Sequence, residues 1–275
     1  MTTNFALKAK NKCLSLHERV RFKLRSLDIA ISPNDHYLKS LRGIHKGSPA
    51  FVIGNGPSLK ADDLTLISQS KAISFAANKI FLLFEEIPFR PSYYFVEDDL
   101  VFKQNYTKIN ELSGFPRLFP RLAHQWGPRI SGSFYFQQLY EDNNSVEFPS
   151  IGSSPLKGFV CGRTVVFSML QFAFYMQCNP IYLIGVDFSF KLPNAPPEGI
   201  QLTGEGEVNH FHPDYRPVGE KWNLPDIPLQ QRVFERVNEF SIRNNFNVLN
   251  ATRGGKLEVF PRVSLDDVLA SLKNS

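Results

Sequence analysis

The chain has 275 residues, a net charge of +5 and three cysteines, and 43% of its residues are hydrophobic. This size and composition allow one large α/β domain with a sizeable core, whereas the absence of a long apolar run excludes a membrane-spanning helix. No secretory signal and no C-x-x-C pair are present, so we expect a cytoplasmic protein without a disulfide framework or a zinc knuckle.

Residues 1–46 are predicted to form a helical arm that is broken at Ser32–Asp35. Between residues 8 and 25, seven basic residues stand against one acidic residue. Apolar residues recur beneath them at helical spacing, namely Leu16, Val20, Leu24 and Leu27. Such a helix can lie on the anionic inner face of a membrane, or it can pack on the domain or on another subunit of a homo-oligomer. Nucleic acid binding is disfavoured, because no recognised motif is present.

After this arm, residues 47–275 are predicted to form one domain in which short strands alternate with helices. Strands are expected at Ala50–Ile53, Ala72–Phe75, Ser92–Val96, Phe134–Gln137, Ile181–Gly185 and Asn247–Leu249. Helices are expected at Lys60–Ser68, Leu100–Leu112, Arg163–Gln177 and Leu229–Asn244. This alternation predicts an α/β fold with a mostly parallel, Rossmann-like sheet that carries helices on both faces.

The first strand runs into a glycine turn made of Gly54, Asn55, Gly56, Pro57 and Ser58. We expect this turn to open a helix, with Pro57 in the first helical turn and both glycines allowing close approach and positive φ. Backbone N–H groups at such a position can bind a phosphate, and the Ser58 hydroxyl can add a donor. The alternative is an ordinary strand-to-helix turn, because the spacing matches neither G-x-G-x-x-G nor a Walker loop.

Three polar residues follow later strands and are expected at the same edge of the sheet. Asn78 follows the second strand, and Asp187 follows the strand that starts at residue 181. Asp98 or Asp99 is expected to cap the next helix, and another acid of the same run would meet a ribose hydroxyl. The acidic run Glu97–Asp99 could instead hold a divalent ion against a diphosphate. Open parallel sheets bind ligands beyond the carboxyl ends of their strands, so these residues are candidates for nucleotide binding.

Cys161 and Gly162 precede the predicted buried helix at 163–177, whose first N–H groups form a second candidate anion site. At a helix N-terminus, Cys161 is expected to have a lowered pKa. A nucleophilic role for its thiol would also need a base, for which His210 is the candidate.

Residues 190–228 are rich in proline and glycine, and we expect them to form a lid that follows the strand ending near Asp187. This segment contains His210 and His212. Histidine is the natural general base near neutral pH, so His210 is a candidate catalytic residue. The alternatives are a surface histidine or a metal pair, although no cysteine or third histidine nearby in sequence completes a metal site.

Taken together, these residues resemble the bacterial lipooligosaccharide sialyltransferases over about Ala50–Asn250. The resemblance rests on five features, which are Gly54–Leu59, Asn78, Cys161-Gly162, Ile181–Phe188 and His210. The chain is also similar to the related group with a hydroxymethylpterin diphosphokinase-like domain, which includes the motility accessory factors linked to nonulosonate transfer onto flagellin. Cys161 stands where the sialyltransferases have a serine. The lid tyrosines of that family have no counterpart in this sequence, and the candidate substitutes for them are Lys191, Tyr215 and Arg216.

The resemblance implies a Rossmann-like glycosyltransferase domain, a GT-A-like sialyltransferase variant, with a lid. It implies transfer of sialic acid or a related acidic sugar from a CMP donor to a surface glycan or glycolipid, without a metal or another cofactor, as in lipopolysaccharide biosynthesis. His210 matches the position of the general base, the glycine turn and Asn78 match nucleotide contacts, and Cys161-Gly162 matches a donor contact.

Two other functions remain open on sequence grounds. A pyrophosphokinase would use ATP with magnesium held by Glu97, Asp98 and Asp187. A non-catalytic nucleotide- or glycan-binding protein would account for the altered donor contacts. Stabilisation by CMP without metal favours the transferase, whereas a shift that needs ATP and Mg²⁺ favours the kinase. Donor hydrolysis without acceptor would argue against the non-catalytic alternative.

Overall fold

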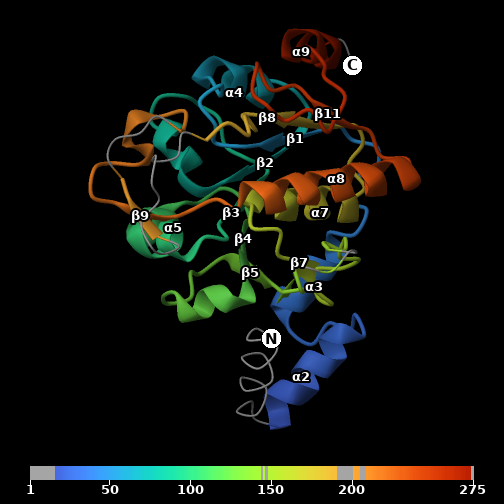
Figure 1. Cartoon of the computed structure of the whole chain (residues 1–275). Helices are drawn as coiled ribbons and strands as arrows, with labels where there is room; N and C mark the ends of the chain where they lie inside the picture. Colours follow the sequence, from blue (N-terminus) through green and yellow to red (C-terminus); the bar gives the residue numbers. More distant parts are fainter. Residues whose placement is uncertain (1–15, 144, 146–147, 191–200, 205–208, 274–275) are drawn as a thin grey trace.

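The computed structural model describes residues 16–143, 145, 148–190, 201–204 and 209–273. Within this part of the chain, seven parallel strands form one sheet in the order β11-β8-β1-β2-β3-β4-β5 (Figure 1). The strands are β1 (Ala50–Ile53), β2 (Ile73–Ala77), β3 (Tyr93–Phe95), β4 (Arg117–Pro120), β5 (Ser133–Phe136), β8 (Ile181–Ile184) and β11 (Val248–Asn250). The predicted α/β fold with a mostly parallel sheet is therefore confirmed.

Successive strand residues face opposite sides of the sheet and so build two separate apolar cores. In β1, Ala50 and Val52 belong to one core, whereas Phe51 and Ile53 belong to the other. The first core is covered by α3 (Pro33–Ser40), α7 (Val165–Tyr175) and α8 (Ile227–Arg243). The second is covered by α4 (Ala61–Ser68), η1 (Asn78–Leu83), α5 (Asp99–Gln104), α6 (Tyr106–Glu111), η2 (Arg121–Gln125) and α9 (Leu265–Lys273). Burial on both faces explains why the strands are almost entirely apolar.

Most predicted elements are found within a few residues of their expected positions, and the exceptions have local causes. The helix expected at 100–112 is two helices, α5 and α6, separated at Asn105. The Asn105 side chain donates to the Val101 carbonyl at 2.9 Å, in competition with the helical backbone bonds. Strand β4 was not predicted, because Pro116 and Pro120 bound its short apolar run and proline normally interrupts a strand.

The N-terminal arm is described from residue 16 onward, as α2 (Leu16–Ser26) followed by α3. The arm is broken into two helices as predicted, but the break lies at residues 27–32 and Pro33–Asp35 form the first turn of α3. Ser32 caps this helix by accepting a hydrogen bond from the Asp35 N–H at 3.2 Å. Leu38 of α3 is buried in the first core. Residues 1–15 of the predicted arm lie outside the described residues.

The predicted lid contains more regular structure than expected. Strands β9 (Gln201–Thr203) and β10 (Lys221–Asn223) pair antiparallel, and the short helix η3 (Pro213–Tyr215) lies between them in sequence. We call residues 201–204 and 209–223 the lid hairpin. The other predicted lid residues before β10, including Lys191, fall outside the described residues apart from Phe190. The remaining short strands, β6 (Gln138–Leu139) and β7 (Phe159–Val160), form a small parallel pair.

Candidate functional site

The glycine turn after β1 is closed by the segment that follows β8. The N–H groups of Gly54 and Gly56 donate to backbone carbonyl oxygens at the end of β8, at 2.8 Å each. The Asp187 carboxylate accepts the Ser58 hydroxyl at 2.8 Å and the Ser58 N–H at 3.2 Å. A carboxylate of the chain itself therefore occupies the place predicted for a phosphate. The burial of Asp187 raises its pKa, and the bonds from Ser58 oppose this shift.

The prediction that this turn opens a helix is wrong. Helix α4 begins at Ala61 after an extended Lys60, and Pro57 lies in an exposed part of the loop. The N–H groups of Gly54 and Gly56 are bonded to carbonyl oxygens at the end of β8, so the chain enters a helix only after these contacts. Asp187 follows β8 at the same edge of the sheet as the glycine turn, as predicted, and its carboxylate is bonded to Ser58.

The two glycines are required for close approach, as predicted, but neither has a positive φ. A Cβ atom on Gly54 would lie 2.3 Å from the carbonyl oxygen of Gly185, and one on Gly56 would lie 1.9 Å from Oδ2 of Asp187. Real Cβ atoms do not approach other atoms so closely, so any side chain there would force the two loops apart.

A second group of predicted residues meets around a cavity of about 100 Å³ beyond the C-terminal ends of β2 and β3. Asn78, Asp98 and His210 all line it, although they are far apart in sequence. The cavity is completed by side chains of η1, α5 and the lid hairpin, namely Lys79, Leu100, Val101, Tyr215, Arg216, Glu220, Lys221, Trp222 and Asn223. This arrangement matches the place where open parallel sheets bind ligands.

Hydrogen bonds and an ion pair hold the lid hairpin against the edge of the sheet. Lys79, which is 4% exposed, donates to Glu220 at 2.6 Å and to the Tyr215 carbonyl at 2.8 Å. Asp98 accepts the Val101 N–H at 3.0 Å, which confirms the predicted cap of α5. Its other oxygen accepts a hydrogen bond from Asn223 of β10 at 3.0 Å.

The lid hairpin also contacts the glycine turn. The Phe211 N–H donates to the Asn55 carbonyl at 3.2 Å, and the Asn55 side chain donates to the Ala77 carbonyl at 3.1 Å. Asn55 therefore links the turn to the end of β2, where Asn78 takes a left-handed φ of 54° that asparagine tolerates better than most residues. The predicted turn and the predicted base are thus connected through Asn55 and Phe211.

His210 lies partly buried and stacked on Tyr215, with ring centroids 3.8 Å apart and planes 5° from parallel. Burial, together with the positive charges of Arg216 and Lys79, lowers the pKa of His210 to about 3. The imidazole is therefore neutral near pH 7 and can accept a proton. An anion bound beside the two cations would weaken their effect and raise this pKa.

Several polar atoms around this cavity are buried without a hydrogen-bond partner among the described residues. Oδ1 of Asn78, Nδ1 of His210 and Nε1 of Trp222 belong to residues that line it, and Oδ1 of Asn55 belongs to the glycine turn. A buried polar group without a partner costs about 1–3 kcal/mol. Their concentration at one place indicates a site prepared for a polar ligand, because unpaired buried groups are otherwise uncommon.

Cys161 and Gly162 are not among the residues that line this cavity, and the expectation of a lowered pKa for Cys161 is wrong. Burial raises the pKa of Cys161 to about 11, and the nearby Glu97 carboxylate adds to this shift. The residue also stands four positions before α7, so its thiol is not at the first turn of the helix. A Cβ atom on Gly162 would lie 2.4 Å from the Phe167 ring, so this glycine serves packing.

Glu97 follows β3 and is held by two side chains. Its Oε1 accepts hydrogen bonds from Gln138 at 2.8 Å and from the Ser168 hydroxyl. Burial raises the pKa of Glu97 to about 7, although both hydrogen bonds act to lower it. Because the raised pKa favours the protonated carboxyl in the folded state, Glu97 makes stability depend on pH.

We expect the stability of the protein to fall as the pH rises from the ordinary pKa of 4.5 toward the folded-state value of about 7. In this range the folded state holds a proton that the unfolded state has lost, and the contribution to the free energy of unfolding is at most about 3 kcal/mol. Urea unfolding at several pH values measures it. Glu97→Gln should remove this slope, the exposed Glu111→Gln should keep it, and identical profiles for wild type and Glu97→Gln would contradict the assignment.

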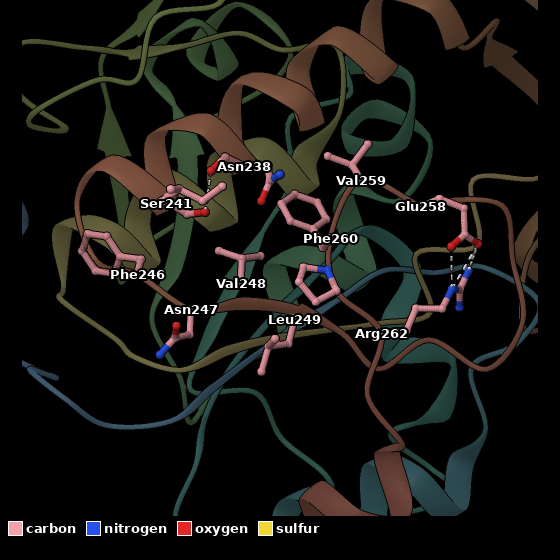
Figure 2. A pocket seen from close by; sticks show the side chains of 12 residues that line it. Asn238, Ser241, Phe246, Asn247, Val248, Leu249, Glu258, Val259, Phe260 and Arg262 are labelled. Carbon is pink, nitrogen blue, oxygen red and sulfur yellow. Dashed lines mark hydrogen bonds and ion pairs between the residues drawn. The ribbon is translucent and has the colours of Figure 1, made fainter.

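A larger cavity of about 550 Å³ lies elsewhere, between the C-terminal half of α8, β11 and residues 258–262 (Figure 2). It runs along the outer side of the edge strand β11, and Figure 2 shows Glu258 and Arg262 paired beside it, at 2.7 Å. None of the predicted site residues is among the residues that line it. Size alone therefore does not identify the site, and we assign the chemistry to the smaller cavity.

Within the described ranges, no group of three or more His, Cys, Asp or Glu side chains is placed to hold a metal ion. Glu97, Asp98 and Asp187, the ligands expected for a magnesium-dependent kinase, do not form such a group. Among the helices that the structure describes, none combines the length and apolar character needed to cross a bilayer.

Sequence reasoning missed part of the cavity, above all Lys79, Glu220 and Trp222. Lys79 directly follows Asn78, but one lysine after a strand carries no signal of its own. Glu220 and Trp222 flank Lys221 after a Pro-Val-Gly turn, and this pattern of a turn followed by alternating residues could have predicted the lid hairpin.

Comparison with known proteins gives one family and two similar structures. A model of the family described as 6-hydroxymethylpterin diphosphokinase MptE-like matches residues 28–192. The MAf glycosyltransferase from Magnetospirillum magneticum AMB-1 is 14% identical with a TM-score of 0.47, over 87% of this chain and 40% of that chain. A mammalian sialyltransferase in complex with Gal-beta-1-3GalNAc-ortho-nitrophenol is 13% identical with a TM-score of 0.39, over 88% of this chain and 80% of that chain. The comparison with curated proteins gives no match.

Proposed function

We propose that this chain, which belongs to the 6-hydroxymethylpterin diphosphokinase MptE-like family, is a glycosyltransferase that moves an acidic sugar from a CMP donor to a glycan or glycolipid. One observation carries the proposal. Asn78, His210 and Trp222 line the same cavity at the carboxyl ends of parallel strands, and each has a buried polar atom that lacks a hydrogen-bond partner within the described residues. Such atoms favour a polar ligand that bonds to several of them at once.

The proposed reaction is a direct displacement at the anomeric carbon of the donor sugar. The acceptor hydroxyl forms a new bond to this carbon while the bond to the CMP phosphate oxygen breaks. His210 takes the proton of the attacking hydroxyl, and its neutral state and its unpaired Nδ1 support this role. The acceptor oxygen thereby becomes a stronger nucleophile, and in this step no residue other than His210 gains or loses a proton.

The departing CMP carries an additional negative charge on its phosphate. Lys79 and Arg216 both act on His210 as positive charges, so they are close enough to the base to stabilise the leaving group as well. Lys79 already pairs with Glu220 of the lid hairpin, and a bound phosphate would compete with that carboxylate. The guanidinium carbon of Arg216 lies 3.5 Å from the centre of the Trp222 ring. In this proposal Arg216 binds the leaving phosphate, the role that the lid tyrosines have in the sialyltransferases.

A pyrophosphokinase is the second candidate, because the matching family takes its name from a diphosphokinase. That activity requires magnesium bridging two phosphates. Among the described residues, Glu97, Asp98 and Asp187 do not form a group placed to hold a metal ion, which favours the transferase over this alternative.

We expect CMP to raise the melting temperature by several degrees without a divalent metal. At a ligand concentration about 100 times the Kd, binding to the folded state alone contributes about 2.7 kcal/mol. Thermal melting with CMP, cytidine, AMP and ATP, each with and without Mg²⁺, makes the measurement. Stabilisation by CMP above cytidine supports the transferase, a shift that occurs only with ATP and Mg²⁺ supports the kinase, and no shift with any nucleotide contradicts both.

A further inference from the structure

Helix α2 lies outside both apolar cores. None of its 11 residues is buried, and Figure 1 shows it extending away from the sheet beyond α3. It is attached through its C-terminal end, where Arg25 pairs with the fully buried Asp35 of α3 at 2.9 Å. Arg121 of η2 pairs with the other oxygen of the same carboxylate. The attachment is therefore ionic and confined to one end of the helix.

One side of α2 carries an apolar stripe that faces solvent. Leu16 and Val20 of α2, and Leu27 just after its end, are 78%, 49% and 57% exposed, and the half-buried Leu24 lies at the margin of the same side. The spacing of these residues places all four within about a quarter of the helix circumference. Exposed apolar residues are common singly, but a continuous stripe of them on a helix marks an interaction surface.

Cations flank this stripe on both sides. At 3.6 residues per turn, Arg19 and Lys23 lie along one flank, and Arg21 lies along the other. Glu18 is the one acidic residue of α2. An apolar stripe between two basic flanks complements a partner that has a negatively charged outer layer and an apolar layer beneath it.

Most helices in proteins are stabilised by packing of an apolar face. The described residues bury none of the side chains of α2 and leave Leu24 half-buried, so most of the stripe is not covered by them. A surface that takes up the stripe would add this stabilisation.

We infer that α2 is a docking element for anionic lipid membranes. Its apolar stripe enters the boundary between head groups and acyl chains, while the flanking cations meet the negative head groups. The inference commits to lipid because of this charge complementarity. It does not depend on the proposed sugar transfer, so either can fail without the other.

The test is flotation of the full chain with vesicles. One set contains phosphatidylglycerol and phosphatidylcholine in equal parts, and the other contains phosphatidylcholine alone. We expect binding to the first set, weaker binding in high salt, and at least about tenfold weaker partitioning to the second set. The double variant Leu16→Ser/Val20→Ser should bind the anionic vesicles at least about tenfold more weakly than wild type. The single variant Lys23→Glu should bind them at least about fivefold more weakly.

Phe22→Ser provides the matched control. Phe22 is 49% exposed, as Val20 is, but it lies on the opposite side of α2. This variant should bind the anionic vesicles within about twofold of wild type. All variants should melt at the wild-type temperature, because no buried residue is changed, and this measurement separates loss of docking from loss of folding.

Three results would overturn the inference. The first is equal binding to both vesicle sets, and the second is equal loss of binding in Phe22→Ser and in Leu16→Ser/Val20→Ser. The third is a dimer in sedimentation that the double variant converts to a monomer, without vesicle binding by the wild type. In that case the stripe would serve a second copy of the chain.

Discussion

Replacing His210 with alanine is expected to lower sugar transfer by about 10²- to 10⁴-fold, the usual contribution of a positioned general base. His210 lies on the lid hairpin, and its Nδ1 finds no hydrogen-bond partner among the described residues, so the variant leaves in place the bonds of Lys79 and Asp98 that hold the hairpin. CMP binding should therefore persist, and kcat should fall more than the affinity for the donor. A transfer assay with a nucleotide-sugar panel, together with CMP-dependent melting, measures both quantities.

His212→Ala is the matched control for this experiment. It stands two residues along the same hairpin, where its Nδ1 accepts the Asp214 N–H at 3.1 Å and its Nε2 lies 3.6 Å from Glu86. We expect transfer by this variant to stay within about tenfold of wild type, because His212 does not line the cavity. Full activity in His210→Ala, or an equal loss in both variants, would remove His210 from the mechanism.

Replacing Gly54 with alanine is expected to lower the free energy of unfolding by about 3 kcal/mol or more. The new Cβ atom would lie 2.3 Å from the carbonyl oxygen and 2.9 Å from the carbonyl carbon of Gly185, and backbone atoms at a strand end have little freedom to move. The neighbouring strands β1 and β8 would have to separate at their C-terminal ends. Urea unfolding measures the change.

Gly127→Ala is the control, because a Cβ atom there would meet its nearest neighbour, a Phe102 ring carbon, at 3.3 Å. We expect this variant to lose less than about 1.5 kcal/mol. If Gly54→Ala unfolds at the same urea concentration as Gly127→Ala, the close approach of the two loops is not a property of the folded protein.

The fold could be predicted from the sequence to a large extent, because each core strand is a short apolar run bounded by turn residues. Strand β1 and the helix α7 were predicted within two residues of their observed limits. Strand β4 was hidden by its prolines, and the split at Asn105 depends on one side-chain bond to a carbonyl. Membership of the hydroxymethylpterin diphosphokinase-like group, predicted from the motifs, is confirmed by the family match.

The site was predicted less completely, for reasons that lie in tertiary contacts. Asn78 and Asp98 follow strands, so topology alone places them at one edge of the sheet. Asp187 also follows a strand, but its bond to Ser58 depends on how two loops meet, and this contact replaced the expected phosphate site. The raised pKa of Cys161 likewise depends on burial, which sequence position does not reveal.

The most direct test of the central claim is a crystal structure of the chain with CMP. We expect the nucleotide phosphate in the cavity between Asn78, His210 and the lid hairpin, within hydrogen-bonding distance of Lys79 or Arg216. Two results would contradict the account. One is CMP bound in the larger cavity along β11. The other is CMP bound against the glycine turn, in place of the Asp187 carboxylate and away from His210.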